Sequence, residues 1–367
     1  ADAAEDPAVL SFPLKQLPQQ RFLRSLRHAG KHQVDGGRCL LRQGQGLQRC
    51  GRAWLAVAVS PAADPLPDPL LQLFIKFIHM IADVRNLTML EPIFKEYNPD
   101  VVFHAAAYKH VPMMEDNPAI AIQNNCYGTR VIADLSVEFG VKKFVMVSTD
   151  KAVNPTNVMG CSKRICEIYV QSLNKAIVEG KVKGVTQFVT TRFGNVLGSN
   201  GSVIPLFREQ IQNGGPITVT HPDIIRYFML IPEACKLVIE AGTMGKGGEI
   251  FVFDMGQPVK ISDLAKNMIR LAGYVPGKDI EIVYTGLRPG EKLYEELLNQ
   301  KELTIPTTNE KILVAKVREY DFDEVSSSIE QLIQSAQEGK IFPTVQLMKE
   351  IVPEYKSKNS IYEKLDK

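Results

Sequence analysis

The chain has 367 residues, enough for one large domain or two modest ones, and its apolar fraction of 45% is that of a globular protein. A formal net charge of +2 gives no reason to expect nucleic acid or an anionic membrane as a partner. The six cysteines include no Cys-x-x-Cys pair, which in a chain of this length indicates reduced cytoplasmic thiols and no disulfide framework. We expect no metal site.

The composition changes near residue 80. Residues 1–80 contain no Thr, Asn or Tyr, whereas residues 81–367 contain 15, 15 and 11 of them. The first 80 residues have no sustained period, which predicts at best short helices around 20–28, 38–49 and 70–79. An out-of-frame, antisense or chimeric origin is our hypothesis for this anomalous segment. Prolines interrupt its longest apolar run, so we expect no transmembrane helix, and a start at Ala1 indicates a fragment of a longer protein.

From residue 81 the pattern predicts alternating strands and helices. Short β-branched runs at 100–107, 142–148 and 185–193 are typical of buried strands, and helical spacing occupies 117–139 and 158–178. Continuous apolar strands separated by helices predict an α/β fold with a doubly wound parallel sheet covered on both faces.

The second half is more mixed. Helices are predicted around 203–213, 232–242, 261–272, 291–299 and 322–337, with short strands at 217–220, 249–253, 280–284 and 311–316.

Polar residues gather where the three main strands end. H-A-A-A-Y-K-H-V-P-M-M-E leaves the first strand, S-T-D-K-A-V-N-P-T-N the second and R-F-G-N-V-L-G-S-N-G-S the third. In a doubly wound sheet, ligands bind beyond the carboxyl ends of the strands. The sequence therefore predicts one ligand site that these three loops share.

These motifs, with N-N-C-Y-G-T, V-M-G-C-S-K-R, H-P-D-I-I-R-Y-F-M and L-R-P-G-E-K-L-Y-E-E-L, resemble the extended short-chain dehydrogenases of polysaccharide biosynthesis. Within that group the chain is most similar to the UDP-N-acetylglucosamine 4,6-dehydratases, over roughly residues 81–340. The resemblance implies a Rossmann-like domain at 81–200 that binds NAD. It also implies a smaller C-terminal part at 201–340 that binds the UDP-sugar, followed by a tail at 341–367.

The resemblance also implies a mechanism and a set of catalytic residues. A 4,6-dehydratase moves a hydride from carbon 4 of the sugar to NAD+, eliminates water across carbons 5 and 6, and returns the hydride to carbon 6. Asp150 and Lys151 match the acid and base of the family's S-T-D-K motif, with Thr149 bonding to the substrate. Met159 stands where most relatives have a catalytic Tyr, which favours the subgroup that retains the configuration at carbon 5. Lys163 would hold the nicotinamide ribose.

The remaining site residues are carried over by motif. Those expected at the cofactor are Asp83, Ala105, Ala106, Ala107, Lys109, Asn124, Ser148, Lys163, Phe193 and Val196. Those expected at the UDP-sugar are Asn195, Ser202, Arg226, Arg288 and Glu291, because the planar guanidinium groups suit diphosphate oxygens.

The resemblance fails where NAD binding normally begins. Residues 20–35 carry one glycine, Gly30, in place of the G-x-x-G-x-x-G turn that presents a helix N-terminus to the pyrophosphate. The first βαβ unit is thus expected to be missing or replaced, and the chain as written to bind NAD weakly with little activity.

Three readings stay open. They are an NAD-dependent UDP-sugar dehydratase, a non-catalytic or damaged fragment of that family, and, as a nearer enzymatic rival, an epimerase or a dehydratase that inverts carbon 5. We expect a homo-oligomer in the cytoplasm, or at the cytoplasmic face of the membrane if full-length relatives carry an anchor.

Overall fold

The computed structural model describes residues 53–59, 76–199, 201–296 and 303–366. The chain divides into two compact units, Ala1–Asp100 and Val101–Lys367, and each is described by itself.

In the first unit, strands β1 (Ala53–Val59) and β2 (Lys76–Ala82) form an antiparallel pair, followed by helix α2 (Leu87–Tyr97). The helix predicted at 70–79 is therefore wrong over residues 76–79, because pairing with β1 satisfies that backbone as a strand. The helices predicted at 20–28 and 38–49, and residues 70–75, lie outside the described residues.

The second unit is built on a six-stranded sheet. Its order is β13 (Leu303–Pro306), β14 (Ile312–Lys316), β10 (Ile250–Phe253), β5 (Gln187–Arg192), β4 (Lys143–Val147), β3 (Val101–His104). Strands β3, β4, β5 and β10 run parallel, whereas β14 and β13 add an antiparallel edge. The predicted α/β fold with a parallel sheet is confirmed.

Strand β3 forms one edge of this sheet, and Phe103 on it is 42% exposed. The strands β1 and β2 pair with each other in a separate sheet. This arrangement agrees with the expectation that the first βαβ unit of the fold is missing or replaced.

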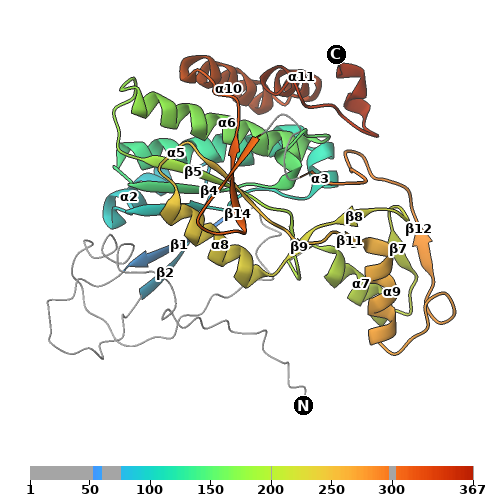
Figure 1. Ribbon diagram of the computed structural model, residues 1–367. Coiled ribbons are helices and arrows are strands. Elements are labelled where there is room, and N and C mark those ends of the chain that lie inside the picture. The colour runs from blue at the N-terminus through green and yellow to red at the C-terminus, as the bar shows by residue number, and fades with distance from the viewer. Residues whose placement is uncertain (1–52, 60–75, 200, 297–302, 367) are drawn as a thin grey trace, which may run out of the picture. The chain divides into compact units, whose positions relative to one another are not determined.

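Helices cover both faces of the parallel strands (Figure 1). Helix α6 (Val158–Val178) packs on β5 from one face, together with α5 (Gly128–Glu138). Helix α8 (Ile231–Met244) buries its apolar side on the other face, against Val145 and Val189. Because successive strand side chains point to opposite faces and both faces are covered, the middle of β4 is buried and apolar, as its apolar run predicted. Strand β5 is also buried, but Phe188 and Val189 are followed there by the polar residues Thr190, Thr191 and Arg192.

The helix predicted at 117–139 is interrupted by a wider turn. It consists of α4 (Pro118–Ala121), the π-helical turn η4 (Ile122–Tyr127) and α5. Asn125 lies in the π turn and hydrogen-bonds through its side chain to the backbone of Tyr108 and to Ser162 Oγ, at 2.7–3.1 Å. The turn thus ties the loop after β3 to helix α6.

A smaller lobe follows β5. Its core is formed by α7 (Val203–Gln212) and α9 (Ile261–Leu271) with β7 (Ile217–Val219), which pairs in parallel with β12 (Ile282–Tyr284). Two short ladders complete it, β8 (Ile225–Arg226) with β11 (Val259–Lys260) and β6 (Asn195–Val196) with β9 (Phe228–Met229).

The helix predicted at 291–299 is wrong over residues 291–296, and residues 297–299 lie outside the described part. The guanidinium of Arg226 donates to the carbonyls of Lys292 and Leu293, at 2.8 and 3.2 Å. Those carbonyls are the acceptors that a helix would have used, so a contact from a distant strand replaces local structure.

The last residues are part of the fold. Helices α10 (Phe322–Gln337) and α11 (Ile341–Ile351) pack on α6. The segment before the final turn η6 (Ile361–Leu365) bonds to two loops, since Lys356 N donates to Pro155 O and Gly290 N donates to Lys358 O. Among the described residues, no helix is long and apolar enough to cross a membrane.

Candidate active site

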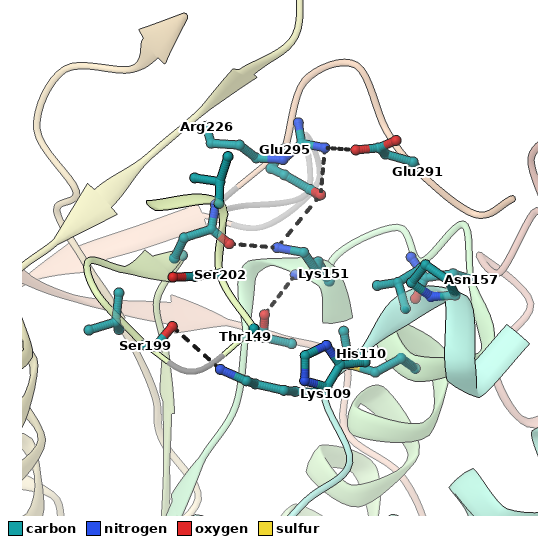
Figure 2. A pocket seen from close by; sticks show the side chains of 18 of the residues that line it. Lys109, His110, Thr149, Lys151, Asn157, Ser199, Ser202, Arg226, Glu291 and Glu295 are labelled. Atoms are coloured by element: carbon teal, nitrogen blue, oxygen red, sulfur yellow. Dashed lines mark hydrogen bonds and ion pairs between the residues drawn. The ribbon is translucent and has the colours of Figure 1, made fainter. Parts of the chain in front are cut away.

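A cavity of about 480 Å³ opens where the strands β3, β4 and β5 end and the smaller lobe begins. Figure 2 shows Lys109 and Lys151 entering it from the sheet side, with Arg226 and Glu291 on the side of the smaller lobe. Most of the predicted site residues line this cavity: Ala105, Ala107, Lys109, Ser148, Thr149, Lys151, Met159, Lys163, Phe193, Asn195, Val196, Ser202, Arg226, Arg288 and Glu291.

Lys151 is held by three oxygen acceptors. Its Nζ lies 3.0 Å from Asp150 Oδ1, 3.3 Å from Asn195 Oδ1 and 3.7 Å from Glu295 Oε1. Burial is the largest influence and lowers the pKa of Lys151, but the charges of Asp150 and Glu295 outweigh burial and the nearby Arg226, so the pKa is raised. Lys151 is therefore an ammonium ion.

Asp150 is completely buried beneath the cavity. Its Oδ1 accepts hydrogen bonds from Thr149 Oγ1 at 2.8 Å and from Lys151, whereas its Oδ2 has no hydrogen-bond partner among the described residues. Gly194 lines the cavity beside it, and a Cβ there would lie 3.0 Å from Oδ2. The absence of a side chain at Gly194 thus keeps space next to this free oxygen.

The turn that carries both residues is fixed by helix α6. The short helix η5 (Asp150–Ala152) lies so close to α6 that a Cβ on Gly160 would come within 2.2 Å of the Lys151 carbonyl oxygen. Asn157 caps α6 by accepting a hydrogen bond from Gly160 N at 2.7 Å. Met159 and Lys163, one turn apart on this helix, are both buried and line the cavity.

The residues expected at the cofactor fall into three groups. Ala105, Ala107 and Lys163 line the cavity, and two small side chains and a buried amine are compatible with a nicotinamide ribose. Ser148 also lines it, but its hydroxyl donates to Glu167 Oε1 at 2.7 Å. Asn124 is buried outside the cavity lining and donates to Asn125 Oδ1.

Ala106 is not part of the lining either, although its neighbours on both sides are. Asp83 belongs to the first unit, where Arg85 forms a two-pronged ion pair with it and lowers the pKa of its carboxyl group. The region in which a glycine-rich turn would be sought, residues 20–51, lies outside the described residues.

Arg226 and Arg288, both expected at the diphosphate, differ in their surroundings. Arg226 is buried, and its terminal nitrogens donate to three backbone carbonyls and to Glu291 Oε1. A diphosphate would have to displace these acceptors to be held by both nitrogens. Arg288 is exposed at the cavity rim, and its backbone N donates to Glu291 Oε2. Its guanidinium is the better placed of the two for a phosphate.

Lys109 and Ser202 lie on loops that border the cavity. Lys109 Nζ donates to Ser199 Oγ at 3.4 Å, and burial, followed by the charge of Lys151, lowers the pKa of Lys109. Ser202 Oγ is buried without a hydrogen-bond partner among the described residues, so it is free to bond to a ligand.

The sequence prediction did not single out Glu295, Asn157 or His110, all of which line the cavity. Glu295 lies within the quoted motif L-R-P-G-E-K-L-Y-E-E-L, four residues after Glu291. The four-residue spacing was the signal available in the sequence. It predicted that both glutamates lie on one face of a helix, and not that Glu295 is buried in the site.

The comparisons with known proteins agree with this geometry. The family model described as "Polysaccharide biosynthesis protein" matches residues 68–317, so the match begins upstream of the expected start at residue 81. The chain is 55% identical over 267 residues to the capsular polysaccharide biosynthesis protein CapD of Staphylococcus aureus, covering 73% of this chain and 43% of that one. It is 52% identical over 250 residues to the probable polysaccharide biosynthesis protein EpsC of Bacillus subtilis, covering 68% and 40%.

Among solved structures, Pen from Bacillus thuringiensis superposes with a TM-score of 0.59 and 33% identity, covering 69% of this chain and 81% of that one. The chain thus spans less than half the length of the two curated relatives and most of the length of the solved one.

Proposed function

Because the chain belongs to the family of polysaccharide biosynthesis proteins, we propose that it serves the dehydration of UDP-N-acetylglucosamine to the 4-keto-6-deoxy sugar with retention at carbon 5. The observation that carries the proposal is the hydrogen bond between Asp150 Oδ1 and Lys151 Nζ beside a cavity in which Met159 replaces a phenol. A thioether exchanges no protons, so acid–base chemistry falls to the Asp150–Lys151 pair.

A single proton shift prepares this pair for an elimination. Moving a proton along the 3.0 Å hydrogen bond from Lys151 Nζ to Asp150 Oδ1 gives a neutral amine and a neutral carboxylic acid. The amine is then the base that accepts the proton of carbon 5, and the acid donates its proton to the hydroxyl group leaving carbon 6. Water departs, and the starting ion pair is restored.

Burial reduces the free-energy cost of this shift, because a low-dielectric site disfavours two charges more than two neutral groups. Thr149 donates to Asp150 Oδ1 and keeps the carboxyl group oriented toward Lys151. Gly160 and the α6 cap hold the turn in place from below.

NAD, when bound, would accept the hydride of carbon 4 and return it to carbon 6. The proton of the 4-hydroxyl group would leave to solvent during the oxidation. During the reduction Lys151 would return the proton to carbon 5 and take a replacement proton from solvent. Lys163 and the small side chains of Ala105 and Ala107 fit its nicotinamide ribose. The sequence of residues 1–80 lacks the family's glycine turn, so we expect weak NAD binding by the chain as written.

The test is product analysis with saturating NAD+ and UDP-N-acetylglucosamine. It uses the chain as written and a chimera in which a glycine-rich βαβ unit precedes residue 68. We expect loss of one water in the chimera, little turnover in the chain as written, and no water loss when Lys151→Met is introduced. Glu296→Gln, a partly exposed carboxylate on a neighbouring loop, is the control and should keep turnover.

Two results would contradict the proposal. Full turnover by the Lys151→Met chimera would remove Lys151 from the mechanism. A product of unchanged mass with inverted carbon 4 would identify an epimerase. Stoichiometric NAD in the purified chain as written would overturn the expectation of weak binding.

A further inference from the structure

Glu295 has a place in the cavity that neither the proposed chemistry nor the packing of the loop explains. We propose that Glu295 is a further residue of this site, whose Oε2 accepts a hydrogen bond from the sugar of the nucleotide-sugar while its Oε1 holds the ammonium of Lys151. The inference rests on the proposed function in one respect, because it takes the ligand to be a nucleotide-sugar.

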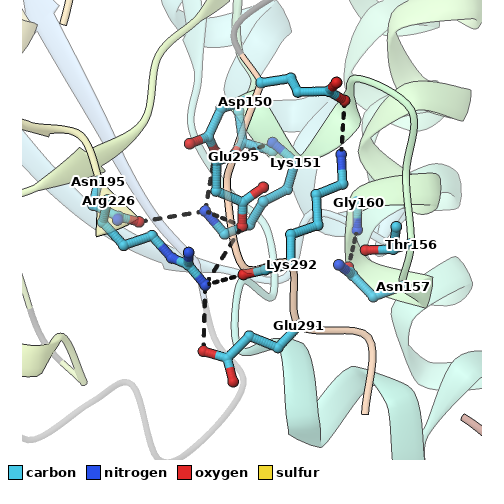
Figure 3. Close-up of polar contacts among 12 residues, drawn as sticks. Asp150, Lys151, Thr156, Asn157, Gly160, Asn195, Arg226, Glu291, Lys292 and Glu295 are labelled. Atoms are coloured by element: carbon cyan, nitrogen blue, oxygen red, sulfur yellow. Dashed lines mark hydrogen bonds and ion pairs between the residues drawn. The ribbon is translucent and has the colours of Figure 1, made fainter. Parts of the chain in front are cut away.

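The position of the carboxylate is the first support (Figure 3). The side chain of Glu295 is 4% exposed, and its Oε1 lies 3.7 Å from Lys151 Nζ and 3.9 Å from Arg226 Nη2. Its Oε2 is buried and has no hydrogen-bond partner among the described residues. One oxygen is thus placed between two cations, and the other lacks a hydrogen-bond partner among the described residues.

The energetic argument is that such an oxygen needs a donor. A buried polar atom left without a partner costs about 1–3 kcal/mol, and more if it is charged. Native structures therefore keep few of them, and those that remain call for an explanation. Because Glu295 lines the cavity, a bound ligand can supply the missing donor.

The chemistry of a carboxylate restricts what that donor can be. An ionised carboxylate accepts hydrogen bonds and donates none. It would repel a phosphate oxygen, whereas a sugar hydroxyl or an acetamido N–H can donate to it. Glu295 therefore points to the sugar part of the ligand and not to its diphosphate.

Asp150, the other carboxylate that contacts Lys151, supports the same conclusion. Its Oδ2 is also buried without a partner among the described residues. The ammonium of Lys151 is thus held by two carboxylates that each keep one oxygen without a partner among the described residues, as expected beside a site for a ligand rich in hydroxyl groups.

Four charged groups act on Lys151: the carboxylates of Asp150 and Glu295, and the cations of Arg226 and Lys109. Arg226 keeps a second anion, Glu291, when Glu295 is neutral. Removing the charge of Glu295 should therefore make Lys151 easier to deprotonate.

The experiment compares binding of UDP-N-acetylglucosamine with binding of UDP, by calorimetry on the full chain. For Glu295→Gln we expect the affinity for the UDP-sugar to fall roughly tenfold, as for a lost hydrogen bond to a charged group, and the affinity for UDP to change less than about twofold. Glu296→Gln is the matched control, and it should change neither. Equal weakening for both ligands, or no weakening for either, would overturn the proposal.

A second measurement does not depend on the ligand. Acetylation of Lys151 by acetic anhydride, followed across pH by mass spectrometry of its peptide, should be several-fold faster at a given pH in Glu295→Gln. Unchanged reactivity would refute the contact with Lys151. If Glu295→Gln does not fold, Glu295→Asp keeps the charge on a shorter side chain and should lose the preference for the UDP-sugar with near-normal acetylation.

These tests separate the inference from the function on which it rests. Both readouts are binding or labelling, so they work without turnover. If the preference for the UDP-sugar depends on Glu295 but no water is lost in the product assay, the proposed dehydration fails and the assignment of Glu295 stands.

Discussion

Two buried ion clusters lie next to each other in this protein, and two adjacent residues, Ser148 and Thr149, each donate a hydrogen bond to one of them. Ser148 donates to Glu167 Oε1, whereas Thr149 donates to Asp150 Oδ1. In the Glu167 cluster, Arg192 bonds both carboxylate oxygens and Arg164 bonds one of them, at 2.6–3.0 Å. In the Asp150–Lys151–Glu295 cluster, two carboxylate oxygens have no partner among the described residues.

We call the Glu167 cluster closed, because both oxygens of its carboxylate are bonded, and the Asp150–Lys151–Glu295 cluster open, because two of its carboxylate oxygens lack a partner among the described residues. Burial alone would raise the pKa of Glu167, but Arg192 and Arg164 lower it to about 2, which shows how fully its charge is compensated. A closed cluster fixes the ends of β4 and β5 to helix α6. The open cluster leaves acceptors for a ligand, at a cost in stability that ligand binding can offset.

The largest effect we expect is on turnover, in the open cluster. Asp150→Asn removes the proton acceptor of Lys151 and should lower turnover of the NAD-binding chimera by roughly 10²–10⁴-fold, the usual contribution of a positioned acid or base. The unfolding free energy should change by less than about 1 kcal/mol, because Thr149 can still donate to the amide and Glu295 still pairs with Lys151. Product assays and urea unfolding measure the two quantities, and turnover near that of the parent would refute the role of Asp150.

In the closed cluster we expect a large effect on the stability of the fold. Glu167→Gln removes the buried carboxylate that both Arg192 and Arg164 contact, and it should lower the unfolding free energy by about 3–5 kcal/mol. Urea unfolding of the chain as written measures this loss. Glu319, the exposed partner of Lys175 in a surface ion pair, provides the control, since Glu319→Gln should change the unfolding free energy far less. A loss as small as that of the control would mean that the cluster contributes little.

A third effect concerns pH. His104 is buried at the end of β3 beside Thr129 Oγ1, and burial, with the charge of Lys163, lowers its pKa to about 3. The folded protein therefore keeps His104 neutral while the unfolded chain takes up a proton below about pH 6.5. Stability from this residue is fully present above that pH and is lost as the pH falls, at about 1.4 kcal/mol per unit.

Replacing His104 should remove this slope. In His104→Gln, the unfolding free energy should vary less between pH 6 and pH 5 than in the parent, by about 1 kcal/mol. Glu167 does not contribute there, because its stabilisation is lost only below about pH 4.5, as the pH falls toward 2. An identical slope in His104→Gln would show that His104 takes up a proton in the folded state.

The sequence predicted those parts of the fold whose environment repeats along the chain. Helix α6 was predicted at its observed bounds, and short runs rich in apolar and β-branched residues located β4 and β5, because strands that are buried on both faces favour such residues. The predicted helix at 291–299 failed because Arg226, far away in the chain, takes its carbonyls. The burial of Glu295 arises in the same way and leaves no local trace.

The smallest effect on turnover that we expect is at Met159. It tests whether this residue, which lines the cavity near the open cluster, takes part in the chemistry. Met159 lines the cavity one turn before Lys163 and is 3% exposed, so it contributes packing beside the reacting groups. Met159→Leu nearly conserves volume and should cost less than about 1.5 kcal/mol of stability. Since neither side chain exchanges protons, turnover of the chimera should fall by less than about threefold. Met159→Ala should lose more stability, by about 2–5 kcal/mol, yet remain far more active than Lys151→Met. A loss of turnover in Met159→Leu as large as that in Lys151→Met would place the thioether in the chemistry and would remove the reason for assigning the proton transfers to Asp150 and Lys151.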